Sequence, residues 1–203
     1  DYAEENFLRD VPLMYFLTVT TAKGSDVKIH GLFVGRDRII FEEAVGLSQK
    51  VNLNYLDEAP MKMVVYLDEK EFKSTWLGNK SVYRTRMAIA DGGELIVLAP
   101  GVQKFGEDDS IDELIRNYGY IGKEEILKLV SSGSDLKNNL SAAAHLIHGS
   151  SDGRFTITYA VSKISKQEIE AVNYKYASFD KMIKLYNPEK LTDGGVCWNF
   201  GGQ

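Results

Sequence analysis

The chain has 203 residues, of which 44% are hydrophobic and 26% are charged, and its formal net charge is −5. These values suit one globular core, and a mildly acidic chain without a basic patch is not expected to bind nucleic acid or an anionic membrane. The single cysteine, Cys197, excludes an internal disulfide and a multi-cysteine zinc site, and we expect it to be inert. No apolar run is long enough to cross a membrane and the acidic first ten residues do not resemble a signal peptide, so we expect a cytoplasmic protein.

The first part of the chain predicts an antiparallel β-hairpin followed by a helix. Two segments rich in β-branched and aromatic residues flank a stretch of turn residues, and Asp37 then offers a helix cap. The predicted strands cover residues 11–20 and 27–34, and the predicted helix covers residues 38–50. We expect His30 to lie on the strand surface.

Beyond Pro60 the chain alternates between apolar strands and amphipathic helices. The predicted strands cover residues 61–67, 94–98 and 154–160, and the predicted helices cover residues 75–90, 110–118, 123–131, 135–148, 165–171 and 179–186. Two of the helix starts, Ser110–Glu113 and Ser165–Glu168, fit the capping-box pattern.

This order of elements predicts an α/β fold. It is typical of a mainly parallel three-layer sheet with crossover helices, here preceded by the β-hairpin and its helix. A weak boundary near Asp57–Pro60 separates a hairpin–helix connection, residues 1–58, from an α/β core, residues 59–203. We interpret both parts as a single domain.

Common catalytic motifs are absent, and the most informative residue is Lys80. Trp76, Lys80, Tyr83 and Met87 fall on one face of the helix predicted over residues 75–90, and we expect that face to be buried. A lysine there must either reach water along its aliphatic stem or meet an anion. The helix also follows a strand, so it begins near the sheet edge where open α/β folds bind ligands. The pattern leaves both interpretations of Lys80 open.

Two further groups of residues could carry chemistry. Glu107, Asp108 and Asp109 lie in the loop after the strand 94–98, where they could bind a cation or stabilise the N-terminus of the next helix. His145 and His148 can face one side of a helix, but no third ligand is evident, so we predict no metal site. The helix dipole alone favours histidines at a helix C-terminus.

The stretch Phe72–Asp108, FKSTWLGNKSVYRTRMAIADGGELIVLAPGVQKFGED, resembles the C-terminal domain of the nickel-pincer lactate racemase family. Residues 134–159, which include NNLSAAAHLIHG, look like the same domain further on, and the front end with GLFVG at residues 31–35 is similar to the connection between the family's two domains. The resemblance implies a racemase or epimerase of 2-hydroxy acids. It also implies that a nickel-pincer nucleotide, held by an N-terminal domain, accepts the α-hydride while a histidine takes the hydroxyl proton.

On this resemblance the chain is the C-terminal, substrate-binding half of such an enzyme, and its partners are a small 2-hydroxy acid and the absent N-terminal domain. Lys80 and Gly92–Gly93 match the spacing of the family's substrate-binding lysine. Trp76 and Leu77 stand where the lactate enzymes have a Tyr-Gln pair, so we expect a larger or more apolar hydroxy acid than lactate. The implied substrate-binding set comprises Trp76, Leu77, Asn79, Lys80, Gln103, Lys104, His145 and His148.

The family's histidine-rich metal and proton-transfer segment is missing from these 203 residues. We therefore assign no catalytic residue and expect no cofactor to bind to this chain alone. One alternative is a stand-alone α/β module that binds a small anion without catalysis and has a closed, polar surface. Another is a scaffold domain without a ligand, in which Lys80→Ala changes only local packing. The sequence leaves open the hydroxy acid, the choice between racemase and epimerase, and whether the chain forms homo-oligomers.

Overall fold

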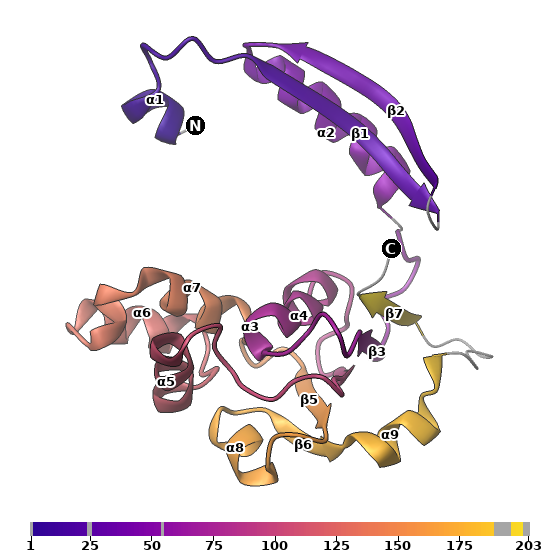
Figure 1. Ribbon diagram of the computed structural model, residues 1–203, viewed down its shortest axis with the longest axis vertical. Coiled ribbons are helices and arrows are strands. Elements are labelled where there is room, and N and C mark those ends of the chain that lie inside the picture. The colour runs from indigo at the N-terminus through magenta and orange to yellow at the C-terminus, as the bar shows by residue number, and fades with distance from the viewer. Residues whose placement is uncertain (1, 24–25, 54, 189–195, 201–203) are drawn as a thin grey trace. The chain divides into compact units, whose positions relative to one another are not determined.

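The computed structural model describes residues 2–23, 26–53, 55–188 and 196–200, and the chain divides into two compact units between Leu56 and Asp57. The first unit contains helix α1 (Tyr2–Phe7), strands β1 (Tyr15–Lys23) and β2 (Asp26–Gly35), and helix α2 (Arg38–Asn52). β1 and β2 pair in antiparallel register, with an irregularity between Val19 and Thr20. Figure 1 shows α2 running along one face of this hairpin, which confirms the predicted hairpin and helix.

The two faces of the hairpin differ in how far they are covered. Val19 on β1 and Ala44 on α2 are buried against each other's elements. α2 approaches the hairpin closely at Gly31, where an added Cβ would lie 2.7 Å from a methyl carbon of Leu47. The opposite face is uncovered within this unit, and it carries five large apolar side chains that are between 43% and 67% exposed: Phe16, Val27, Ile29, Leu32 and Val34.

The second unit is built around a parallel sheet. Its strands are β3 (Lys62–Leu67), β4 (Glu94–Leu98), β5 (Thr156–Val161), β6 (Lys175–Ser178) and β7 (Val196–Phe200), in the spatial order β6-β5-β4-β3-β7. All four pairings are parallel, which confirms the predicted parallel sheet. Neither β6 nor β7 is among the strands predicted from the sequence. The side chains of β7, including Cys197, lie outside the part of the chain that the structure describes.

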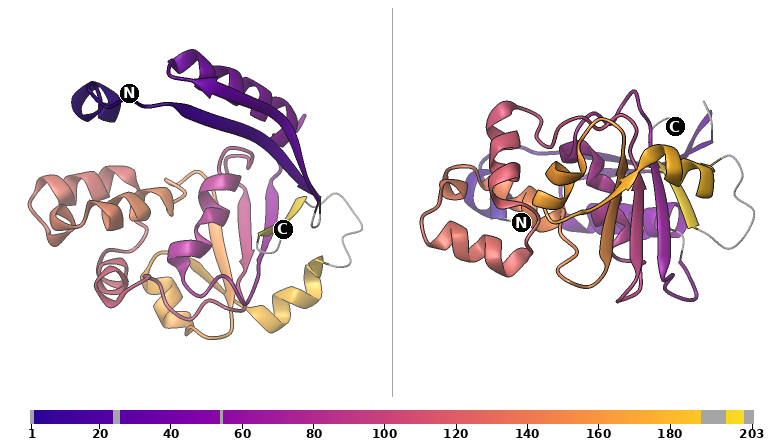
Figure 2. Two further views of the ribbon diagram at one scale, coloured as in Figure 1. Left: turned by 45° about the horizontal axis from the view of Figure 1, so that its top comes forward. Right: turned by 90° about the horizontal axis from the view of Figure 1, so that it is seen from below.

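Helices cover both faces of this sheet (Figure 2). The helices are α3 (Thr75–Gly78), α4 (Lys80–Thr85), α5 (Asp109–Tyr118), α6 (Lys123–Ser131), the short 3-10 helix η1 (Asp135–Asn138), α7 (Leu140–His148), α8 (Lys166–Ala171) and α9 (Phe179–Leu185). One face of the sheet presents Met63, Val65 and Val97 to the main core, whereas Val64 and Ile96 face α9. This alternation gives the three predicted layers, because side chains of successive strand residues point to opposite faces. No helix among the described residues is long and apolar enough to cross a bilayer.

Three local predictions were wrong. The helix predicted over residues 75–90 is two short helices that meet at Asn79. The helix predicted over residues 135–148 is interrupted at Asn139. The side chain of Asn139 caps α7 by accepting a hydrogen bond from the backbone N–H of Ala142 at 3.0 Å. The predicted capping box at Ser110–Glu113 is also wrong, since the Asp108 carboxylate takes that place and accepts from the N–H of Ile111 at 2.8 Å. An aspartate accepts this hydrogen bond with a full negative charge at the positive end of the helix. The capping box at Ser165–Glu168 is confirmed.

Candidate functional site

In the segment predicted as a helix over residues 75–90, the face expected to be buried does not pack against the core. Trp76 and Lys80 are half-buried, while Tyr83 is 38% and Met87 is 88% exposed. The face toward the core carries Thr75, Asn79, Ser81, Val82 and Thr85, which are at most 2% exposed. The prediction failed because polar residues are buried here, and a polar group is buried readily when its hydrogen bonds are satisfied.

Lys80 is the first residue of α4, and it follows Trp76 of α3 by four residues across the junction at Asn79. Its position is half-buried, and among the described residues no carboxylate or hydrogen-bond acceptor contacts its ammonium group. Other lysines in this unit have partners: the ammonium group of Lys163 lies 2.9 Å from a carboxylate oxygen of Glu69. The ammonium of Lys80 is therefore available to an external anion.

Next to Lys80, the side chain of Asn79 is at the centre of a buried hydrogen-bond network. Its carbonyl oxygen accepts from the hydroxyl group of Tyr159 at 2.7 Å and lies 3.1 Å from that of Tyr174, whose single proton also has the carbonyl oxygen of Gly149 within 2.8 Å. Its amide nitrogen lies 3.4 Å from Nε2 of His145. Gly149 leaves the space for this arrangement, because an added Cβ would lie 2.4 Å from the amide nitrogen of Asn79.

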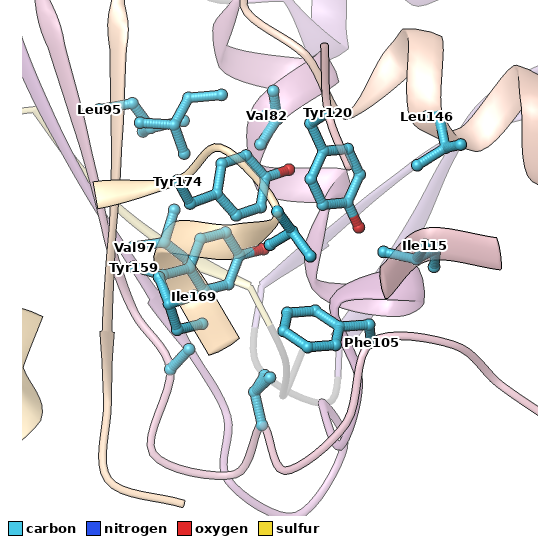
Figure 3. Packing of buried hydrophobic residues seen from close by; sticks show 14 of the residues in the cluster. Val82, Leu95, Val97, Phe105, Ile115, Tyr120, Leu146, Tyr159, Ile169 and Tyr174 are labelled. Carbon is cyan, nitrogen blue, oxygen red and sulfur yellow. The ribbon is translucent and has the colours of Figure 1, made fainter. Parts of the chain in front are cut away.

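Three tyrosines form a stack beside Asn79, and Figure 3 shows their rings side by side. The ring of Tyr174 is 4.4 Å from that of Tyr120 and 4.9 Å from that of Tyr159, with nearly parallel planes in both pairs. Burial raises the pKa of each of these phenol groups above its ordinary value, so all three keep their protons near neutral pH. The stack therefore supplies neutral hydroxyl groups at fixed positions under α3 and α4.

His145 on α7 links this buried network to the surface. Its Nε2 lies 3.0 Å from the hydroxyl group of Tyr120, and its ring packs on Trp76 with 4.5 Å between the ring centroids. Burial, and to a lesser extent the charge of nearby His148, lowers the pKa of His145 from its ordinary value to about 4. His145 is thus a neutral imidazole near pH 7. His148 is exposed, and its ring meets that of Tyr83 at 6.5 Å.

The loop between β4 and α5 pairs with the start of α3. The N–H groups of Thr75 and Trp76 donate to the carbonyl oxygens of Lys104 at 3.1 Å and of Phe105 at 2.8 Å. The ammonium group of Lys104 donates to the carbonyl oxygen of Glu107 in its own loop. Gln103 in the same loop is exposed. These contacts confirm that the loop and the helix start share the C-terminal edge of the sheet.

The structure brings together part of the predicted site. Trp76, Asn79 and His145 are in contact, Lys80 follows Asn79 directly, and Leu77 packs against the main core. Gln103 and Lys104 lie at the N-terminus of α3, one turn before Lys80. The acidic loop residues divide between two structural roles: Asp108 caps α5, and Glu107 accepts from the hydroxyl group of Ser74 at 3.4 Å.

Sequence reasoning missed Tyr120, Tyr159, Tyr174 and Thr75, which complete the network around Asn79. The hydroxyl group of Thr75 lies 2.9 Å from that of Tyr120 and donates to the carbonyl oxygen of Phe105 at 3.0 Å. One available indication was Tyr159 in an otherwise apolar strand, because a buried tyrosine needs a hydrogen-bond partner. Its partner, Asn79, is eighty residues earlier in the chain, so the sequence could not identify it.

A hollow of about 410 Å³ lies on another side of the tyrosine stack. Its lining includes Tyr120, Ser150, Phe155, Asn173 and Lys175, and none of the eight predicted site residues belongs to it. This hollow is therefore separate from the contacts among Trp76, Asn79 and His145. In the described part of the chain, no group of three or more His, Cys, Asp or Glu side chains could hold a metal ion.

The fold and the site define the second unit as a parallel three-layer α/β core with a buried polar network under a half-buried lysine. Two solved structures share the fold of the chain. A protein from Thermotoga maritima superimposes with a TM-score of 0.70 and 22% identity over 97% of this chain and 49% of that chain. The lactate racemase apoprotein from Thermoanaerobacterium thermosaccharolyticum superimposes with a TM-score of 0.51 and 12% identity over 85% of this chain and 41% of that chain.

These two likenesses show a common fold, and the chain spans about half the length of the structures it matches. No protein-family profile and no curated protein matches the sequence. The similarity to lactate racemase accords with the family that the stretch Phe72–Asp108 resembles. The activity of the longer proteins is not carried to this chain by the fold itself.

Proposed function

We propose that this chain is the substrate-binding half of a lactate racemase-like enzyme and that it binds a 2-hydroxy acid anion beside Lys80. The observation that carries the proposal is that the ammonium group of Lys80 has no partner among the described residues, while Lys80 directly follows Asn79, the centre of the buried network. An ammonium group without an internal partner can donate a charge-assisted hydrogen bond to a carboxylate. The neighbouring indole of Trp76 offers an apolar surface to the rest of the ligand.

The residues that the structure describes do not fit the nickel of a nickel-pincer nucleotide. The described part of the chain offers no cluster of metal-ligating side chains, and its three histidines are placed elsewhere: His30 bonds to Thr21 in the hairpin, His145 bonds to Tyr120, and His148 lies beside Tyr83. We therefore assign to this chain the binding of the substrate, and we derive no chemical step from it. The nickel and the proton-transfer histidine of the implied reaction would belong to another domain.

The face of the hairpin opposite α2 is uncovered within the first unit, and this supports a larger assembly over a stand-alone module. On it Phe16 pairs with Val34, and Thr18 pairs with Leu32, so the face is apolar and uncharged along these positions. A two-stranded sheet with one helix is marginal in water, and a sheet that is apolar on both faces is normally covered on both. A closed, polar surface was the expectation for the stand-alone module. We propose that another α/β domain, the partner implied by the resemblance, covers this face.

Titration of the 203-residue chain with lactate, 2-hydroxybutyrate and mandelate tests the binding site, with ¹H–¹⁵N NMR as the readout. We expect saturable shifts of the indole N–H of Trp76, and a weaker affinity by about tenfold in Lys80→Gln, the loss of one charge-assisted hydrogen bond at a partly exposed site. Lys163→Gln is the matched control, because that ammonium is already paired with Glu69. Equal affinity in wild type and Lys80→Gln would remove Lys80 from the site.

A further inference from the structure

We infer that the hollow beside the tyrosine stack is a second ligand site, and that it binds a small α-amino acid in its zwitterionic form. Lys175 pairs with the carboxylate of the amino acid, Glu170 pairs with its ammonium group, and the side chain of the ligand lies on an apolar floor. The inference goes beyond the proposed function and does not rest on it, because none of the residues assigned to the hydroxy acid lines the hollow.

The hollow lies where β5 and β6 begin, at the end of the sheet opposite the loop between β4 and α5. Its lining includes Thr156 and Lys175, the first residues of these two strands. β5 pairs with β6 only from Thr158 onward, so the first two residues of β5 have no paired residue in β6. The volume of about 410 Å³ falls within the range of about 300–1,000 Å³ that small-molecule sites occupy.

The floor of the hollow is apolar. It is made of four largely buried side chains, each between 3% and 6% exposed: Tyr120, Phe155, Ile157 and Tyr174. The hydroxyl group of Tyr120 lies 2.9 Å from that of Thr75, and the hydroxyl group of Tyr174 donates to the carbonyl oxygen of Gly149 at 2.8 Å. The polar ends of both tyrosines are therefore occupied, and their rings are what they offer to a ligand. Such rings favour an apolar group.

The hollow also has polar side chains whose hydrogen-bonding capacity is unused. Ser151, Asn173 and Lys175 make no side-chain hydrogen bond or ion pair with any residue that the structure describes. Ser150 is 4% exposed and its hydroxyl oxygen accepts from the backbone N–H of Asp152 at 3.0 Å, but its own proton has no acceptor in the described chain. Each of these groups can donate a hydrogen bond, so together they favour a ligand with carboxylate oxygens.

Two opposite charges line the hollow without pairing with each other. Lys175 has no carboxylate within the described chain at ion-pair distance, and Glu170 meets only Lys166, at 3.7 Å in an exposed pair that contributes little. A ligand with a carboxylate alone is repelled by Glu170, and a ligand with an amine alone is repelled by Lys175. An α-amino acid carries both charges on one end and an apolar side chain on the other, which matches the two charges and the floor.

Asn173 offers a change that tests the hollow without disturbing the fold. Its φ of 67° is in the left-handed region, where asparagine and glycine are the most readily accepted residues. Asn173→Gly therefore keeps the backbone conformation of the turn between α8 and β6, and it removes one unused amide from the lining.

Titration with L-phenylalanine, 3-phenylpropionate and phenethylamine tests the inference, because the second ligand lacks the ammonium group and the third lacks the carboxylate. In ¹H–¹⁵N NMR we expect saturable shifts of the Ser151 backbone amide and the Asn173 side-chain amide, with phenylalanine binding most tightly. Lys175→Gln should weaken phenylalanine and 3-phenylpropionate by about threefold and should not weaken phenethylamine. Glu170→Gln should weaken phenylalanine and phenethylamine by about as much and should not weaken 3-phenylpropionate. Lys137→Gln, at an exposed position outside the hollow, is the control.

Three outcomes would overturn the inference. Phenylalanine could leave the Ser151 and Asn173 resonances unmoved, 3-phenylpropionate could bind as tightly as phenylalanine, or Asn173→Gly could fold normally and bind phenylalanine with unchanged affinity. If phenylalanine shifts the indole N–H of Trp76 in place of these resonances, the inference also fails. None of these results bears on the hydroxy acid titrations, whose readouts are Trp76 and Lys80→Gln, so the two proposals fail separately.

Discussion

Replacing Asn79 with leucine should destabilise the second unit by about 2–3 kcal/mol. The change leaves the hydroxyl group of Tyr159 without the acceptor that lies 2.7 Å away, and a buried polar group that loses its partner costs about 1–3 kcal/mol. Tyr174 and His145 lose less, because the single hydroxyl proton of Tyr174 keeps an acceptor in the carbonyl oxygen of Gly149 at 2.8 Å and His145 keeps its contact with Tyr120. The expected cost is therefore that of one orphaned hydroxyl group plus a smaller contribution from the weakened contacts.

A double-mutant cycle with Tyr159→Phe isolates this contribution. Removing both partners of a buried hydrogen bond costs less than removing one, so the double variant should recover about 1–2 kcal/mol relative to the sum of the two single changes. Urea denaturation followed by tryptophan fluorescence suits the measurement, because both tryptophans, Trp76 and Trp198, belong to the second unit. Far-UV circular dichroism would report on both units together.

The outcome that would refute this reasoning is additivity. If Asn79→Leu and Tyr159→Phe add within about 0.5 kcal/mol, the two side chains do not interact and the network around Asn79 is not formed as described. A loss below about 0.5 kcal/mol in Asn79→Leu alone would lead to the same conclusion. Leu140→Ala is a suitable control in the same unit, since that side chain is 63% exposed and should change stability little.

Three further outcomes follow from the same contacts. The pKa of His145 in the folded chain, about 4, lies below its ordinary value of 6.5, so the unfolded chain takes up this proton first as the pH falls. The free energy of unfolding should therefore fall by at most about 3 kcal/mol between pH 6.5 and pH 4. This fall should be absent in His145→Asn. Gly149→Ala should lower the free energy of unfolding, measured by urea titration, by about 2 kcal/mol or more, because the new Cβ would lie 2.5 Å from the ring of Tyr120. In Gly46→Ala, the new Cβ in α2 meets nothing within 4 Å, so the free energy of unfolding should rise by about 0.5–1 kcal/mol. Leu32→Lys, on the uncovered hairpin face, should reduce self-association of the isolated chain in light scattering and should weaken any complex with the proposed covering domain.

The order of elements was predictable because most of the strands are apolar runs separated by amphipathic helices. The parallel sheet, the hairpin and α2 all followed from period and turn chemistry. Helix breaks were not predictable at Asn79 and Asn139, because each asparagine is compatible with a continuous helix until its side chain finds a tertiary or capping partner. β6 was missed because it is four residues long, KYAS, with no apolar run.

The candidate site was predictable only in part, and for a specific physical reason. A hydrophobic stripe predicts the core face of a helix when the core is apolar, but α3 and α4 bury Thr75, Asn79 and Thr85 instead. Lys80 was selected for its place on a supposed buried face, and it remains of interest because its ammonium group lacks a partner in the described chain. The tyrosine stack could not be anticipated, since its members are brought together by the sheet and not by sequence spacing.

The stack of Tyr120, Tyr174 and Tyr159 also determines when the site can exist. Its rings come from the connection before α6, the residue just before β6 and the middle of β5, and Asn79 contacts two of them from the junction of α3 and α4. A nascent chain that ends before Tyr174 lacks the central ring of the stack and one donor to Asn79. Fragments divided between α7 and β6 should therefore bind no carboxylate until they are recombined, and recovery of binding would follow the rate at which the sheet assembles.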